Sequence, residues 1–94
     1  MSKDDFVKTI NLIKGYYRIT FSDEELELLK NELKDLTYDE FIDEIKDTML
    51  TTIEFFKISE LHRILVNYRD MKMFLKRNNL NSFEELYANY EKIN

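Results

Sequence analysis

A helix-capping pattern occurs three times in this chain, each time directly before apolar residues spaced three or four apart. The copies are SDEE at 22–25, TYDE at 37–40 and SFEE at 82–85, with a weaker version, SKDD, at 2–5. In S/T-x-x-E the hydroxyl accepts from the backbone N–H three residues on, and the acid reaches back to the N–H of the capping residue. The pattern therefore predicts helices that begin just after Ser2, Ser22, Thr37 and Ser82.

The apolar spacing places one inward stripe on each predicted helix, because residues three and four apart share a face. The first stripe is Phe6, Ile10, Ile13 and Tyr17, and the second is Leu26, Leu29, Leu33 and Leu36. The third is Phe41, Ile42, Ile45 and Met49, which Ile53 and Phe56 would extend. A fourth helix, which we expect Ser59 to cap, carries Leu61, Ile64, Leu65, Tyr68, Met71 and Leu75. The last, short helix carries Phe83, Leu86, Tyr87 and Tyr90.

These helices predict an all-α fold, a small bundle of four main helices plus a short C-terminal helix. The 94 residues predict a single domain, with a core bundle over 1–77 and a loop and C-terminal helix over 78–94 that could serve as a partner-binding appendage. The chain has no proline and one glycine, Gly15, which either ends the first helix or permits close packing within it. We favour the second, because Tyr17 continues the stripe beyond it. The stretch 16–21 is interpreted as a connector. The short junction at 35–37 predicts a tight corner or an antiparallel hairpin between the second and third helices.

The residues offer little for catalysis. There is no cysteine, His62 is the only histidine, and the serines lie where helix caps are expected. No zinc, P-loop or EF-hand pattern is present. We therefore predict no catalytic residue, no cofactor and no metal site. We also expect no membrane span and a soluble intracellular protein.

Charge is distributed unevenly along the chain, whose formal net charge is −5. The acidic segment, residues 23–47, holds eleven carboxylates and three lysines, and therefore carries −8. The basic stretch, residues 61–77, holds five cations and one aspartate, and carries +4. We interpret the acidic segment mainly as the solvated side of the second and third helices. The alternative is an acidic DNA mimic or other small inhibitor that binds a nucleic-acid enzyme.

Some apolar residues lie off the predicted stripes, notably Leu28, Met73 and Phe74. Exposed methionine and aromatic groups beside arginine are typical of protein-binding anchors. The competing interpretation is that the last helix folds back and buries those near the C-terminus. Direct nucleic-acid binding by the basic stretch is not expected, because the acidic helices would repel the same polymer.

The stretch 12–65 resembles the phage replicative-helicase loader and inhibitor proteins of low-GC Gram-positive hosts. A paired aromatic, Tyr16-Tyr17, ends the first helix, and a short connector leads to a cap that begins Phe21-Ser22. A second box follows with aromatics at Tyr38 and Phe41. The sequence FKISEL, 56–61, then opens the last bundle helix, where the family usually has prolines and a threonine.

The resemblance implies a non-enzymatic adaptor of DNA replication that acts in the cytoplasm of a bacterial host. Such an adaptor binds a hexameric replicative helicase, inhibits or loads it, and can also meet an origin-binding initiator. It engages the helicase through its C-terminal part. Carried onto this chain, the expected partner-binding residues are Arg69, Lys72, Met73, Phe74, Lys76, Arg77, Tyr87 and Tyr90.

Overall fold

All regular structure in the described part of the chain is helical. The computed structural model describes residues 1–79, and no strand occurs among them. The elements are α1 (Lys3–Tyr17), α2 (Asp23–Leu33), α3 (Tyr38–Glu40), the π-helical turn η1 (Phe41–Ile45), α4 (Lys46–Thr52) and α5 (Ile58–Arg77). The predicted all-α fold is thus confirmed. The predicted C-terminal helix, with Tyr87 and Tyr90, lies outside the described residues.

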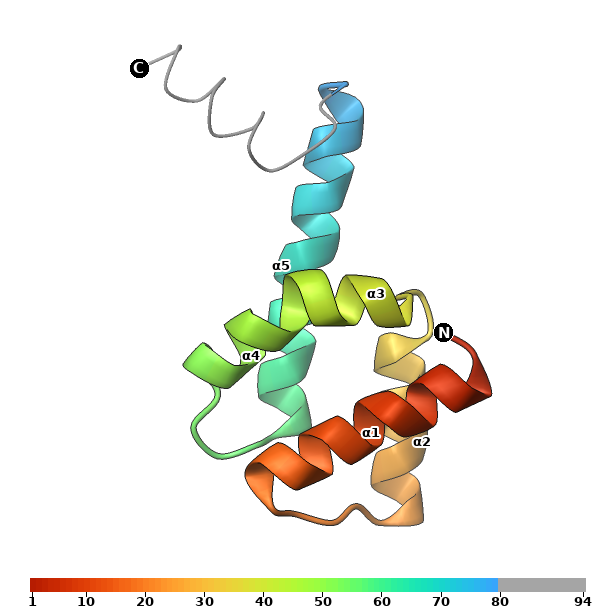
Figure 1. The fold of residues 1–94 in the computed structure, drawn as a ribbon. Coiled ribbons are helices and arrows are strands. Elements are labelled where there is room, and N and C mark those ends of the chain that lie inside the picture. The colour runs from red at the N-terminus through yellow and green to blue at the C-terminus, as the bar shows by residue number, and fades with distance from the viewer. Residues whose placement is uncertain (80–94) are drawn as a thin grey trace.

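The helices form two crossed layers. Figure 1 shows α1 and the α3–η1–α4 helix in front, with α2 and α5 behind them at a steep angle. The crossing brings α2 against α5, α1 against α3, and α5 against both η1 and α4. The C-terminal half of α5 continues past α3, so one end of this helix projects from the bundle (Figure 1).

The capping predictions hold for α1 and α2. The Ser2 hydroxyl accepts from the Asp5 N–H, and the full box between Ser22 and Glu25 is formed. The helix α1 continues through Gly15 and ends at Tyr17, and its C-cap, Arg18, adopts a left-handed conformation with φ 54°. The expectation of close packing at Gly15 is wrong, since a Cβ built there would meet nothing within 4 Å.

The corner between the second and third predicted helices is present. Leu36 is buried at the turn, and Thr37 then forms a complete capping box with Glu40. The helix that follows passes through one wide turn, in which the Lys46 N–H donates to the Phe41 carbonyl. In a regular α-helix residues four apart drift by about 40° around the axis. The wide turn reduces this drift, which helps Phe41, Ile45 and Met49 all reach the core.

Two predicted details of the second half of the chain are wrong. The third helix stops at Thr52, and Ile53 has an extended backbone, so Ile53 and Phe56 enter the core from a loop. The cap of α5 is Lys57 rather than Ser59, and it has no side-chain hydrogen bond. Backbone N–H groups of residues 60 and 61 instead donate to the Lys57 carbonyl. The loop geometry sets this helix start, which the serine alone did not reveal.

One core joins α1, α2, η1, α4 and α5. Its buried members come from the four predicted stripes that lie within residues 1–79, and partly buried stripe residues such as Phe6, Ile42 and Tyr68 pack against it. The buried members are Ile10, Ile13, Leu29, Leu33, Leu36, Phe41, Ile45, Met49, Ile53, Leu61, Ile64 and Leu65. Leu75 is also buried, but it lies outside this cluster. Within residues 1–79, no helix has both the length and the apolar character needed to cross a membrane.

Candidate partner-binding surface

Six of the eight predicted partner-binding residues lie in the last turns of α5. They fall into two groups. Arg69 and Lys72 turn toward the bundle, whereas Met73, Phe74, Lys76 and Arg77 are exposed on the projecting end of the helix. We call these four exposed residues the α5 tip. The remaining two, Tyr87 and Tyr90, lie outside the described residues, so the structure does not bring them to this surface.

Arg69 and Lys72 tie α5 to the acidic helices. The Arg69 guanidinium donates to the Glu32 carbonyl at the end of α2, at 2.5 Å. The Lys72 ammonium donates to Glu40 Oε2 at 2.5 Å and lies 5.4 Å from the centre of the Tyr68 ring. Both cations therefore make contacts that stabilise the fold. The sequence did not reveal these contacts, because both residues lie opposite the apolar stripe.

Glu40 joins the start of α3 to α5. One carboxylate oxygen closes the Thr37 capping box, and the other accepts from Tyr68 and Lys72 of α5. The hydrogen bond from Lys72 is the main reason that the pKa of Glu40 falls from 4.5 to about 2. Burial opposes this shift, and the hydrogen bonds from Tyr68 and the Thr37 backbone add to it. The burial of Tyr68, and then its bond to this carboxylate, raise the pKa of the phenol. The pair fixes α5 on α3.

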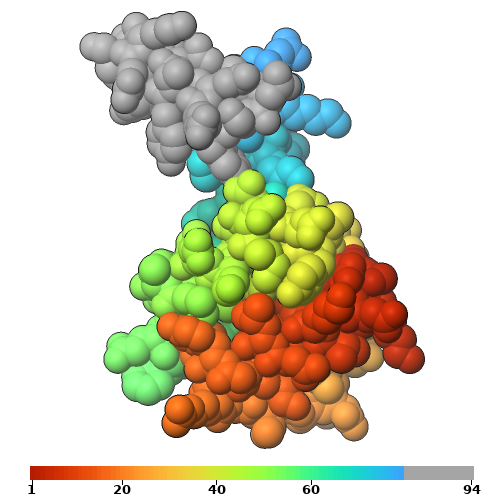
Figure 2. Space-filling view, in the orientation of Figure 1, coloured from red at the N-terminus to blue at the C-terminus, as the bar shows by residue number. Residues whose placement is uncertain are grey.

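The α5 tip is apolar at its centre and cationic at its edge. Met73 is 52% exposed and Phe74 is 49% exposed. Within residues 1–79, neither Lys76 nor Arg77 makes an ion pair. The space-filling view shows this end of α5 rising above the green and yellow surface of α3 and α4 (Figure 2). Such a surface suits a partner with an apolar hollow and an acidic rim.

The acidic segment is mostly solvated, in agreement with its main interpretation. Of its carboxylates, only Glu32 and Glu40 are partly buried, and both meet α5. His62 Nδ1 lies 2.8 Å from the Glu32 carboxylate, so the only histidine is an exposed residue with a carboxylate partner. Among residues 1–79 no three metal-ligating side chains are grouped closely enough to hold a metal ion. Leu28, 54% exposed, is the apolar exception on α2.

A second surface lies at the opposite end of the bundle, around the paired tyrosines. The Tyr17 hydroxyl donates to the carbonyls of Met49 and Ile53, at 3.2 and 2.9 Å, and so closes the C-terminal end of α4. Burial raises the pKa of Tyr17, with a smaller effect of Tyr16. The ring of Tyr17 also packs against Phe56, with centroids 5.4 Å apart. The paired aromatic is thus a structural clamp.

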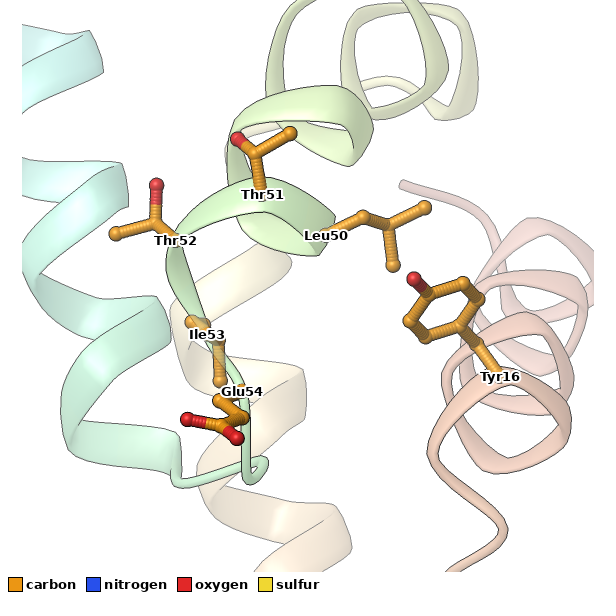
Figure 3. A pocket seen from close by; sticks show the side chains of 6 residues that line it. All are labelled: Tyr16, Leu50, Thr51, Thr52, Ile53 and Glu54. Atoms are coloured by element: carbon orange, nitrogen blue, oxygen red, sulfur yellow. The ribbon is translucent and has the colours of Figure 1, made fainter.

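Beside this clamp is an open hollow of about 480 Å³. Figure 3 shows Tyr16 of α1 facing Leu50 of α4 across it, with Ile53 and Glu54 on the following loop. The Thr51 hydroxyl on its wall is already committed to the Asp47 and Thr48 carbonyls. Its ionisable groups are one carboxyl and one phenol. The hollow offers no convergent set of polar groups that would fix the orientation of a small molecule.

One exposed anchor escaped the sequence analysis. Phe55 is 76% exposed, the highest value among the large apolar side chains of residues 1–79, and it stands in the loop between α4 and α5. Its neighbour Phe56 packs into the core, so the pair is split between solvent and interior. The only sequence signal was that two adjacent residues cannot both face inward from an extended loop.

Comparison with known proteins adds no assignment. No protein-family model matches the chain, and neither the curated proteins nor the solved structures include a significant match.

Proposed function

We propose that this protein is a non-enzymatic adaptor of phage-type DNA replication, which binds a hexameric replicative helicase and inhibits or loads it. The proposal rests on the resemblance of residues 12–65 to the loader and inhibitor family. A single structural observation supports it best: the α5 tip presents Met73 and Phe74 to solvent beside two cations that make no ion pair within residues 1–79. Surfaces of this composition are typical of binding anchors.

Some residues of α5 hold the helix on the bundle and others face solvent, which supports the proposed location of the binding surface. Arg69 and Lys72 hold α5 on the bundle, so the turns that follow project as one rigid helix. A preorganised helix loses little conformational entropy when it binds, which favours affinity from a small surface. The α5 tip is therefore the proposed contact with the helicase, and the acidic face of α2 could meet the basic surface of an initiator.

The test uses a purified hexameric replicative helicase from a low-GC Gram-positive bacterium. Near-stoichiometric protein should change its ATPase or unwinding rate and co-elute with it. Phe74→Ala should raise the Kd by about tenfold or more, as expected for a central anchor. Leu28→Ala is the matched control, because Leu28 is equally exposed on α2 and should leave binding unchanged. No co-elution and no rate change with the wild-type chain would reject the proposal.

The second candidate is an acidic protein that imitates DNA and occupies a nucleic-acid enzyme. The observation that favours it is the solvated row of carboxylates, with Glu24, Glu27, Asp43 and Glu44 all exposed. Reversing these four charges should abolish binding to such an enzyme and leave the α5 tip dispensable. The adaptor proposal predicts the reverse for binding to the helicase.

A further inference from the structure

The outer face of α5 carries a symmetric set of four residues. Asp70, Met73, Phe74 and Arg77 are all exposed and have the spacing i, i+3, i+4, i+7. We call this set the α5 diamond. It is the group of side chains that one helix offers to another at a single crossing, because rows three and four residues apart form the ridges of a helix. The helix it belongs to projects from the bundle (Figure 1).

The charges of the α5 diamond are complementary to those of the same four residues in a second copy of the chain. A two-fold axis between residues 73 and 74 relates two antiparallel helices so that each Asp70 faces the other chain's Arg77. The same operation gathers Met73 and Phe74 of both copies at the centre of the contact, where each lies nearest its own counterpart. An interface of this kind is self-complementary, as a two-fold contact requires. A parallel arrangement would instead set Asp70 against Asp70 and Arg77 against Arg77, which like-charge repulsion disfavours.

Neither charge has a competing partner in the described part of the chain. No ion pair or hydrogen bond from residues 1–79 engages the side chains of Asp70 or Arg77. They stand two helical turns apart, about 10 Å along the axis, so their own geometry disfavours a bond between them. As far as residues 1–79 are concerned, both therefore remain available to a second molecule.

We propose that the protein self-associates through the α5 diamond as an antiparallel two-fold dimer. The contact goes beyond the proposed function and does not depend on it. Its four residues per chain make a small interface, so the dimer forms weakly and exchanges with monomer. The net charge of −5 on each copy opposes association at low salt, whereas physiological salt screens charges that lie more than about 8 Å apart. The dimer would cover Met73 and Phe74, and so would compete with any partner of the α5 tip.

A charge-exchange series tests the pairing on the full chain without any partner. Sedimentation equilibrium at up to about 1 mM protein should show a monomer–dimer equilibrium for the wild type. Asp70→Arg or Arg77→Asp alone should raise the dissociation constant by about tenfold or more, because each replaces two attractive pairs with two repulsive ones. The double exchange restores both pairs and should restore the wild-type equilibrium.

A crosslinking measurement gives an independent readout. The chain has no cysteine, so Met73→Cys introduces a single thiol close to the proposed two-fold axis. Oxidation should give a covalent dimer more rapidly than for Leu28→Cys, whose thiol is equally exposed but lies on α2. A wild-type chain that stays monomeric overturns the proposal, and so does a dimer that ignores both single charge reversals. Because no helicase is present, neither result bears on the adaptor function.

Discussion

The Tyr68 hydroxyl of α5 donates to Glu40 Oε2 at 2.8 Å, and the same oxygen accepts from Lys72 one turn later. Glu40 also completes the capping box that starts α3. One carboxylate therefore stabilises a helix start and fixes the position of another helix 28 to 32 residues further along the chain.

This arrangement predicts different outcomes for two substitutions of Glu40. Glutamine can still close a capping box, so Glu40→Gln removes mainly the charge and should lower the free energy of unfolding by about 1 kcal/mol. Glu40→Ala also removes the cap and the acceptor for Tyr68, and should cost about 2–3 kcal/mol. Urea unfolding followed by circular dichroism measures both. Glu27→Gln, on the exposed face of α2, is the control and should change little.

The low pKa of Glu40 predicts how stability depends on pH. The folded value of about 2 lies below the ordinary 4.5, so ionised Glu40 stabilises the folded chain at and above pH 4.5. This contribution disappears as the pH falls from 4.5 toward 2. Melting temperatures of wild type and Glu40→Gln should therefore differ at pH 7 and converge in that interval. A constant difference down to pH 2 would contradict the proposed role of the charge.

The clamp at the end of α4 predicts unequal effects of two neighbouring tyrosines. Tyr17→Phe leaves the Ile53 carbonyl without its hydroxyl donor, and should lower the free energy of unfolding by about 1–2 kcal/mol. Tyr16→Phe should be nearly neutral, because Tyr16 is 56% exposed and its hydroxyl faces the open hollow. Equal losses in thermal or urea unfolding would show that the hydroxyl of Tyr17 does not close this helix.

Gly15 predicts a stabilising substitution. It lies inside α1, is exposed, and has open space where a Cβ would stand. Gly15→Ala should therefore raise the free energy of unfolding by about 0.5–1 kcal/mol, because glycine in a helix interior costs conformational entropy. A higher urea midpoint with an unchanged slope would confirm this. A loss of stability would mean that the backbone at this position needs glycine after all.

Alanine substitutions at two serine positions should change the free energy of unfolding by different amounts. Ser22→Ala removes a formed capping box and should cost about 1 kcal/mol. Ser59→Ala should be close to neutral, because Lys57 is the cap of α5 and no side chain serves it. The melting temperatures of the two variants, compared at one pH, distinguish these outcomes. A clear loss for Ser59→Ala would return the capping role to the serine.

Local signals in the sequence were enough to determine the helical class, the capping boxes at Ser22 and Thr37, and nearly all of the core. The reason is that caps and stripes act over three or four residues, within the reach of a single helix. Leu29, Leu33 and Phe41 are buried because the period of the helix places them on its inner side. The exposure of Met73 and Phe74 followed from the same period.

Tertiary structure alone decided what joins the helices. Nothing local shows that Arg69 reaches the Glu32 carbonyl, that Tyr17 closes α4, or that Glu40 serves two helices at once. These contacts connect residues about 30 to 40 positions apart, and their geometry depends on the crossing of two layers. The start of α5 at Ile58 and the split of Phe55 from Phe56 depend on the same crossing, because the loop between α4 and α5 must bring one helix onto the other.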